Sequence, residues 1–408
     1  MPRTTLALTS FVSGEFGNKL TGRTDFDKYS SAAKTLENFL IHPQGAATRR
    51  VGTQFIAEVK DSSKKTRLIP FEFSTTQTYI LEFGDQYIRF FKDKGQILSS
   101  GVPYEISSPY LEAELFDIKF AQSADVMYIC HPNHPVKKLS RTGHTSWTLA
   151  TVSFGGSPSP GITGSDNRPS SVSFYEQRLV FAGTNNNPQT LWFSKAGDYE
   201  NFTTGTNADD AMIYTIASNQ VNAIKYLKAQ RTLVVGTTGG EFTVSADGTD
   251  ASITPTNVTI KKQSSYGSSN VDAVTAGNAI LFLQKAKRKI RELQYNFDSD
   301  SYVAPDLCIL NDTVTKSGIN EMAFQQEPSS IVWCVRDDGV LAALTYQRSE
   351  SVVAWTRHIF GGAFGSGNAV CESVASISGV LTEDEVWVIV KRTINGATKR
   401  YVECFSDF

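Results

Sequence analysis

Residues 170–202 read S-S-V-S-F-Y-E-Q-R-L-V-F-A-G-T-N-N-N-P-Q-T-L-W-F-S-K-A-G-D-Y-E-N-F, a stretch of short apolar runs separated by turn-forming residues. β-Branched and aromatic residues fit a pleated sheet, whereas Gly, Asn, Asp and Pro tolerate the dihedral angles of turns. This alternation predicts an antiparallel sheet of four strands. The expected strands cover residues 172–174, 179–182, 191–193 and, as a weak outer strand, 199–202.

The same pattern recurs along nearly the whole chain, in seven units. The units cover Arg67–Leu98, Phe116–Val152, Ser170–Phe202, Val221–Ile260, Val271–Val303, Asn320–Ile359 and Val374–Phe405. Successive units begin roughly 45 to 50 residues apart, which is the period of blades in a radially repeated fold. We therefore predict an all-β fold, a β-propeller of about seven four-stranded, blade-like units. Other all-β architectures stay open, because regularly spaced strands also occur in sandwiches and barrels. None of the units carries the G-H…W-D pair typical of WD40 repeats.

Closure of the ring needs a strand from outside the seventh unit. That unit has no obvious fourth strand before the chain stops at Phe408. Because first and last blades of a propeller must be joined, two alternatives follow. Either an N-terminal strand over Gly52–Val59 completes the seventh blade, or the chain is a truncated product.

The first 60 residues differ from the repeats, so we divide the chain into an N-terminal segment, 1–60, and a propeller, 61–408. Within the segment, Asp25 or Asp27 is a candidate cap for a small helix. Apolar residues of that expected helix follow three-and-four spacing at Tyr29, Ala33, Leu36 and Leu40. The segment is expected either to pack on the propeller or to reach a neighbouring subunit.

The composition excludes several classes of protein. Lys and Arg number 39 against 41 Asp and Glu, so a net charge of −2 gives no overall attraction to nucleic acid or anionic membrane. No run approaches the ~18 apolar residues of a membrane span, and no signal-peptide pattern follows the N-terminus. Synthesis in a cytoplasm is expected. Five widely spaced cysteines without a C-x-x-C pair predict buried, reduced thiols: Cys130, Cys308, Cys334, Cys371 and Cys404.

Several segments carry a resemblance to a known family. Residues 11–29 (F-V-S-G-E-F-G-N-K-L-T-G-R-T-D-F-D-K-Y), 36–56 (L-E-N-F-L-I-H-P-Q-G-A-A-T-R-R-V-G-T-Q-F-I) and 67–84 resemble the opening of tail tubular protein B, or nozzle, proteins of short-tailed bacteriophages. Residues 175–183 (Y-E-Q-R-L-V-F-A-G) and 191–202 resemble their middle region. Members of that family extend beyond the position that matches Tyr401–Phe405, so this chain is expected to be a short member or a segment.

The resemblance implies a structural virion protein in the phage tail, made in the host bacterial cytoplasm. Such a subunit would form a ring with copies of itself, a homohexamer, below the adapter or gatekeeper protein. The ring would channel phage DNA during ejection, without sequence specificity, and would support tail fibres. Two alternatives are a receptor- or glycan-binding propeller of a fibre or spike and a glycan-cleaving propeller enzyme.

A cationic cluster is the one candidate contact site. Its members lie within seven residues: Lys285, Lys287, Arg288, Lys289 and Arg291. On a neutral protein they would create a local positive field for phosphate of passing DNA or for an acidic neighbouring subunit. Alternating strand positions would place Lys287, Lys289 and Arg291 on one face. The alternative is an edge hairpin whose charges prevent strand addition.

Signals for catalysis, cofactors and metals are weak, and we expect a protein that is not an enzyme. His131 and His134 flank a predicted tight turn next to Cys130, but no second ligand pair with zinc spacing is near. Asp298 and Asp300 lack the terminal Glu of a calcium loop. We therefore predict no catalytic residue, no cofactor and no metal.

Overall fold

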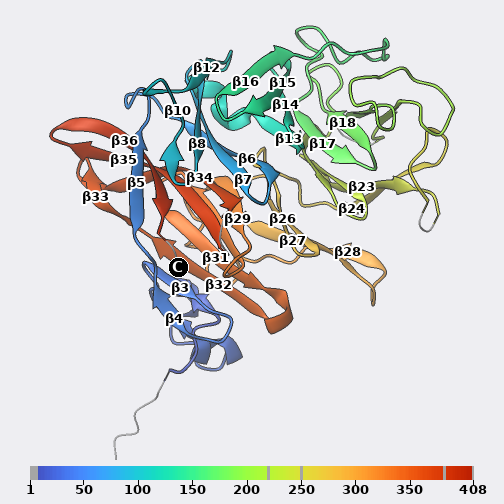
Figure 1. The fold of residues 1–408 in the computed structure, drawn as a ribbon. Helices are drawn as coiled ribbons and strands as arrows, with labels where there is room; N and C mark the ends of the chain where they lie inside the picture. Colours follow the sequence, from blue (N-terminus) through green and yellow to red (C-terminus); the bar gives the residue numbers. More distant parts are fainter. Residues whose placement is uncertain (1–7, 218–220, 249–250, 380–382, 407–408) are drawn as a thin grey trace, which may run out of the picture.

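The computed structural model describes residues 8–217, 221–248, 251–379 and 383–406, and it is a β-propeller (Figure 1). Seven antiparallel sheets of four or five strands follow one another in chain order around a central axis. Helical structure in these residues is limited to short 3₁₀ turns, and none of it is long and apolar enough to cross a bilayer. The predicted fold class is therefore confirmed.

The first three blades are described from the innermost strand outward. Blade 1 contains β6 (Arg67–Ser74), β7 (Gln77–Gly84), β8 (Tyr87–Lys92) and β12 (Glu105–Ser107), with β9 (Gly95–Gln96) beside β8. Blade 2 contains β13 (Lys119–Ser123), β14 (Val126–His131), β15 (His134–Gly143) and β16 (Ser146–Thr151). Blade 3 contains β17 (Ser171–Tyr175), β18 (Arg178–Ala182), β19 (Thr190–Phe193) and β20 (Met212–Thr215).

The next three blades repeat this order. Blade 4 contains β21 (Ile224–Ala229), β22 (Leu233–Thr237), β23 (Gly240–Ala246) and β24 (Val258–Ser264). Blade 5 contains β25 (Val274–Ala276), β26 (Ala279–Leu283), β27 (Ile290–Asn296) and β28 (Ser301–Val303). Blade 6 contains β29 (Ile319–Gln325), β30 (Ile331–Arg336), β31 (Leu341–Gln347) and β32 (Val352–His358).

Blade 7 closes the ring with a strand from the N-terminal part of the chain. Its sheet contains β33 (Phe360–Phe364), β34 (Gly367–Ser378), β35 (Asp384–Ile394) and β36 (Ala397–Phe405), followed by β5 (Thr53–Glu58). β5 pairs antiparallel with β36, and Gln54 lies opposite Cys404. The strand expected over residues 52–59 therefore completes the seventh blade.

The core lies between the blades. Seven clusters of buried apolar side chains each join two neighbouring blades, including the last to the first. Four fully buried tryptophans contribute to this core: Trp192, Trp333, Trp355 and Trp387. Because both faces of each sheet are covered by a neighbouring blade, the central strands are apolar on both sides. Every residue of β26 is apolar, and in β18 only Arg178 is not.

The predicted N-terminal helix is wrong. Residues Asp27–Ser31 form one 3₁₀ turn, η2, and the chain continues through β2 (Ala32–Ala33) and β3 (Phe39–Ile41). β2 pairs with β1 (Gly14–Glu15), and β3 pairs with β4 (Ala47–Arg49). The backbone between β2 and β3 hydrogen-bonds the outer strand β32: Asn38 N donates to Arg357 O, and Arg357 N donates to Leu36 O. A helix cannot make these bonds to a strand edge. The spaced apolar residues have separate partners instead: Tyr29 packs on Phe16, Leu36 on β32, and Leu40 on the cluster between blades 6 and 7.

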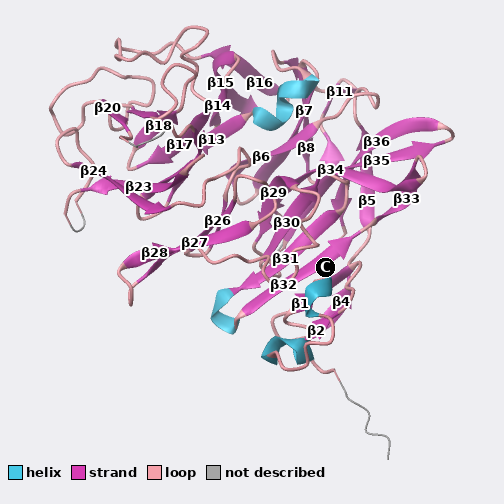
Figure 2. Cartoon of the chain, turned by 180° about the vertical axis from the view of Figure 1, so that it is seen from behind, coloured by secondary structure: helices cyan, strands magenta, loops and turns pink. Residues whose placement is uncertain are grey.

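The segment therefore packs on the propeller itself, on the outer side of blade 6 (Figure 2). Leu36 and Ile41 are buried against Val352 and Ala354 of β32. Gly14 makes the closest approach: its φ is +67°, and an added Cβ would lie 2.4 Å from the backbone nitrogen of Trp355. Only glycine fits this position.

The predicted fourth strand of blade 3 is also wrong. Residues 199–202 form a loop, and β20 supplies the strand 10 residues further on. Phe202 is buried against Phe154 and Phe181, and the ring of Tyr199 packs on Phe174. These aromatic residues thus pack between blades 2 and 3 and do not form a β-strand. The buried guanidinium of Arg178 holds the following loop by donating to carbonyls of Ser194, Ala208 and Asp210.

Candidate functional site

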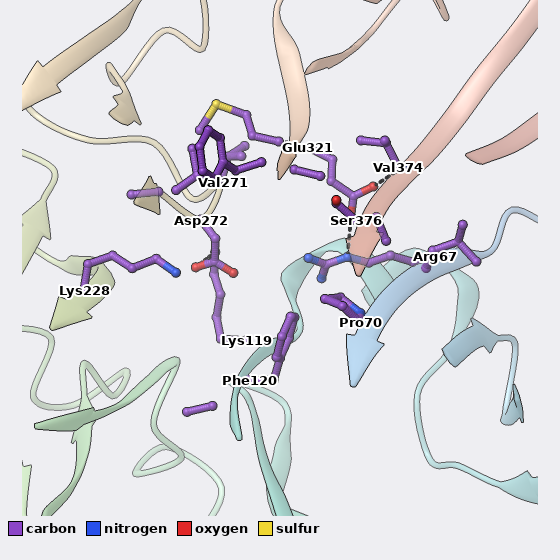
Figure 3. Close-up of a pocket in the computed structure, with 18 of the residues that line it drawn as sticks. Arg67, Pro70, Lys119, Phe120, Lys228, Val271, Asp272, Glu321, Val374 and Ser376 are labelled. Atoms are coloured by element: carbon purple, nitrogen blue, oxygen red, sulfur yellow. Dashed lines mark hydrogen bonds and ion pairs between the residues drawn. The ribbon is translucent and has the colours of Figure 1, made fainter. Parts of the chain in front are cut away.

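The central channel is a cavity in the middle of the ring. It has a volume of about 450 Å³ and is lined by residues in or next to the innermost strand of all seven blades. Five of its lining residues are charged, and Figure 3 shows them directed into the channel: Arg67, Lys119, Lys228, Asp272 and Glu321. Each comes from a different inner strand or the short segment just before one, so the propeller brings together side chains that are far apart in the sequence.

One buried ion pair joins blades that are not neighbours in the ring. Arg67, at the start of β6 in blade 1, donates from Nε to Glu321 Oε1 of blade 6 over 2.8 Å. Its Nη1 also donates to the carbonyls of Leu115 and Ile118. Glu321 Oε2 accepts from Ser373 Oγ at 2.6 Å and from Val374 N at 2.9 Å, both in blade 7. Because both charges are hydrogen-bonded, the pair is compatible with its burial.

A second pair crosses from blade 2 to blade 5. Lys119 of β13 donates from Nζ to Asp272 Oδ1 over 3.0 Å and to the carbonyl of Asn270. Burial lowers the pKa of the Lys119 ammonium, and the carboxylate of Asp272 opposes that shift. Burial alone would raise the pKa of Asp272, but the charges of Lys119, Lys228 and Arg67 lower it overall. Lys228 approaches the same carboxylate from blade 4 (Figure 3).

These two ion pairs cross the channel and fill part of it with polar side chains. Side chains from opposite parts of the ring meet within it, together with the rings of Phe120 and Phe174. A volume of this size is typical of a small-molecule site. The arrangement can hold the blades together and present one carboxylate and one ammonium to a small polar ligand. The sequence did not reveal these residues. An inner strand that faces the channel alternates polar and apolar residues in the same way as a strand that faces solvent.

The cationic cluster does not form one face. Arg291 is buried: its guanidinium donates to Ala304 O and Gln284 Oε1 and lies 3.4 Å from the centre of the Tyr266 ring. Lys289 pairs with Asp306 over 2.7 Å, and Lys287 donates to Asn320 Oδ1. Lys285 and Arg288 are exposed. The alternation expected for Lys287, Lys289 and Arg291 fails because Lys287 lies in the β26–β27 turn with a φ of +59°.

His131 and His134 do come together, and a third residue joins them. The ligand atoms of Glu114, His131 and His134 all lie within 4.8 Å of one another. His134 Nε2 and Glu114 Oε2 are 2.7 Å apart. Glu114 belongs to the 3₁₀ turn η3 (Glu112–Asp117) before blade 2, and the histidines end β14 and begin β15. The sequence did not point to Glu114 because it lies outside the turn.

Two members of this trio, Glu114 and His131, have shifted pKa values. Burial on its own would raise the pKa of Glu114, but hydrogen bonds from Leu111 N, His134 and Asn133 lower it to about 2. Burial lowers the pKa of His131. Its Nδ1 accepts from Asn133 N at 3.1 Å, and its Nε2 is buried without a hydrogen-bond partner. Cys130 points elsewhere, into the cluster between blades 2 and 3.

The other sequence candidates have structural partners. All five cysteines are buried and none of them forms a disulfide, as predicted. Asp300 accepts from the Tyr295 hydroxyl at 2.6 Å within the β27–β28 turn.

Comparison with known proteins shows a fold and no family. No family model matches the sequence, and no curated protein matches it. Among solved structures, the chain is similar to the crystal structure of RRP9 WD40 repeats, with a TM-score of 0.52 and 9% identity over 88% of this chain and 99% of that one. It is also similar to the Cps50 (Swd1) β-propeller domain of Myceliophteria thermophila, with a TM-score of 0.51 and 9% identity over 87% of this chain and 100% of that one.

A third similar structure is the Pan2 WD40 domain of Neurospora crassa, with a TM-score of 0.50 and 10% identity over 88% of this chain and 95% of that one. Sequence identities this low show the propeller fold alone. The ring architecture is thus shared with WD40 propellers, although this sequence lacks their G-H…W-D pair.

Proposed function

We propose that this chain is a structural ring subunit of a short bacteriophage tail, a nozzle protein that acts by shape and by repeated subunit contacts. The observation that carries the proposal is the resemblance of residues 11–29, 36–56 and 67–84 to the opening of that family. The proposed partners are copies of the same chain in a hexamer, the adapter protein, the tail fibres and passing DNA.

The places of the resembling segments support this proposal. Residues 11–29 contain Gly14, which lies against the backbone of blade 6. Residues 36–56 include β3, β4 and most of β5, so they cover an outer edge and close the ring. The segments that resemble the nozzle family therefore attach the N-terminal segment to blade 6 and close the ring. Residues with such structural roles are expected to be shared by proteins of one family.

The path proposed for DNA lies between subunits. The channel inside one propeller has a volume of about 450 Å³ and is bridged by the Arg67–Glu321 and Lys119–Asp272 pairs. A duplex therefore needs a lumen enclosed by several propellers. A net charge of −2 suits such a lumen, because many phosphate contacts would slow transit through accumulated affinity.

Ring formation requires heterologous contacts between copies. Large apolar side chains are exposed on projecting parts of the propeller, among them Phe297 at the β27–β28 turn, which is 85% exposed. Val102 and Leu98 project from blade 1 in the β10–β11 hairpin, Leu98–Ser99 with Val102–Pro103. Exposed aromatic and aliphatic groups of this kind suit the buried centre of an interface.

A receptor- or glycan-binding propeller is the second candidate function. The channel favours it, because Phe120 and Phe174 lie beside charged groups in a cavity of ligand size. Saturable binding of a host glycan, lost when Asp272 is replaced by Asn, would support this alternative. The nozzle proposal predicts no such binding.

Antibody labelling of virions tests the proposed function. An antibody to this chain should label the axial tail below the portal, and averaged images should show six-fold symmetry. Label confined to peripheral fibres would contradict the nozzle proposal and favour the receptor-binding propeller.

A further inference from the structure

Three potential metal ligands converge at one end of blade 2. Glu114 comes from η3, which leads from blade 1 into blade 2, and His131 and His134 flank the two-residue turn between β14 and β15. All three ligand atoms lie within 4.8 Å of one another. We propose that Glu114, His131 and His134 bind one divalent transition-metal ion, and that zinc fits this site best.

The donor set is the first argument. Two imidazole nitrogens and one carboxylate oxygen are ligands that Zn²⁺ accepts, and three protein ligands leave a fourth position for water. Bonds of about 2.0–2.2 Å place the ligand atoms of a tetrahedral zinc roughly 3.5 Å apart. The three groups need to move toward a common centre by little more than a side-chain adjustment. The side chains of Glu114 and His134 are 16% and 19% exposed, so both touch solvent, from which an ion can enter.

The hydrogen bonds around the trio are the second argument. His131 is 1% exposed, yet its Nε2 has no hydrogen-bond partner. Buried polar atoms without partners are rare and need an explanation. Ligation through Nε2 would give this atom a partner and would move the ring proton to Nδ1. The hydrogen bond from Asn133 N to Nδ1 would then be lost, which is the structural change that binding requires.

The surroundings are the third argument. The carboxylate of Glu114 is held by Leu111 N at 3.0 Å and by Asn133 Nδ2 at 3.2 Å, so its orientation is fixed from behind. Such outer contacts orient ligands in metal sites. The Tyr110 ring packs against both histidines, at 5.0 Å from His134 and 6.0 Å from His131. Arg168 braces the turn by donating to the carbonyl of Asn133.

A bound ion would fasten two parts of the propeller that the sequence separates. Glu114 and His134 are 20 residues apart, and between them the chain leaves blade 1 and forms the first hairpin of blade 2. The ion would hold the entry segment to the β14–β15 turn. This proposal is independent of the phage-tail function and applies to the single chain.

Cobalt titration tests the site in the full-length chain, purified without a histidine tag and treated with chelator. Co²⁺ should produce the visible absorption of a tetrahedral nitrogen–oxygen site with one equivalent bound, and Zn²⁺ should abolish it. Glu114→Gln and His134→Gln should each weaken Co²⁺ binding at least tenfold. His42→Gln is the matched control, because His42 lies in a different part of the chain and contacts Thr48; it should bind as the wild type does.

Zinc should also raise the melting temperature of the wild type and of His42→Gln, and not that of His134→Gln. The circular dichroism spectrum of each variant must match that of the wild type, which shows that the variant is folded. His131 is not replaced, because a substitution at this buried position could disturb the fold. Binding that is unsaturated at millimolar Co²⁺, or equal in all variants, would overturn the proposal. A near-ultraviolet thiolate-to-cobalt band would overturn it as well, because it would place the ion on a cysteine.

Discussion

Buried charges connect distant parts of the ring at the level of single residues. The Arg67 guanidinium bridges Glu321 and two backbone carbonyls, although Arg67 and Glu321 are 254 positions apart. Removing one partner of a buried pair leaves an uncompensated charge, which costs more than the pair itself contributes.

We predict that Arg67→Met lowers the free energy of unfolding by about 3–5 kcal/mol. The double variant Arg67→Met/Glu321→Gln should lose less than the sum of the two single variants, because the neutral amide that replaces the Glu321 carboxylate carries no unpaired charge. Urea unfolding measures both. Lys19→Met is the control, since the Lys19–Asp312 pair is exposed and should change stability by less than about 1 kcal/mol. Additive losses would contradict the role of the pair.

Glu82 should make stability depend on pH. It is fully buried in β7, and burial raises its pKa from 4.5 to about 7, against the opposing effect of the Tyr87 hydroxyl. Between these two values the folded state holds a proton that the unfolded state has lost, so stability falls as pH rises. The loss should total about 3 kcal/mol and level off above pH 7.

The Glu82→Gln variant should lack this decline. Its free energy of unfolding, relative to the wild type, should therefore increase between pH 5 and pH 8. Urea unfolding at the two pH values measures the difference. A constant difference between variant and wild type would show that Glu82 does not titrate in this range.

The N-terminal segment depends on one glycine where it contacts blade 6. Gly14→Ala should detach it, because the new Cβ meets backbone of Ala354 and Trp355 that cannot move aside. Faster proteolysis of residues 8–50 would report the detachment. Gly22→Ala is the matched control: Gly22 also has a positive φ, +80°, but nothing lies within 4 Å of an added Cβ. Equal protection of both variants would contradict the contact.

Ring closure can be tested with a cysteine placed on β5. Gln54→Cys would lie opposite the native Cys404 of β36, so oxidation should form a disulfide between residues 350 positions apart. The bond should raise the melting temperature and alter mobility in a non-reducing gel. Phe55→Cys, the next residue on the opposite face, should form no bond with Cys404. A Gln54→Cys chain that stays reduced would argue against the β5–β36 register.

Strands that repeat could be predicted from the sequence, and irregular segments could not. Blades 2 and 6 follow their apolar runs closely, because both faces of their central strands are buried. Residues 199–202 misled the prediction because aromatic side chains suit an interface as well as a strand. The expected helix failed because pairing with the β32 edge, which lies more than 300 residues away, determines the backbone of residues 36–38.

The candidate sites were only partly predictable for the same reason. The turn that joins His131 and His134 is visible in the sequence, whereas Glu114 and the channel pairs are brought together by the ring. The cationic cluster could be recognised from the run of Lys and Arg residues. The sequence did not show that Arg291 and Lys289 make contacts within the chain.

At the scale of the whole molecule, the exposed members of the cationic cluster are candidates for contact with DNA or a neighbouring subunit. Lys285→Glu/Arg288→Glu should leave the melting temperature of the isolated chain unchanged, because both residues are exposed. If the cluster serves assembly or DNA passage, virions carrying this variant should be formed or should infect at least tenfold less well. Normal infectivity would exclude that role.

The propeller offers a rigid body whose inner strands are joined across the channel and whose last blade is closed by β5. Such a body suits the ring subunit that we propose, whose lumen would have to stay open during DNA passage. Electron cryomicroscopy of the tail of the source virion tests this account most directly. We predict six copies of the seven-bladed propeller around the tail axis below the adapter, with the DNA path between them. A tail axis without this propeller, or propellers found only on fibres, would contradict the account.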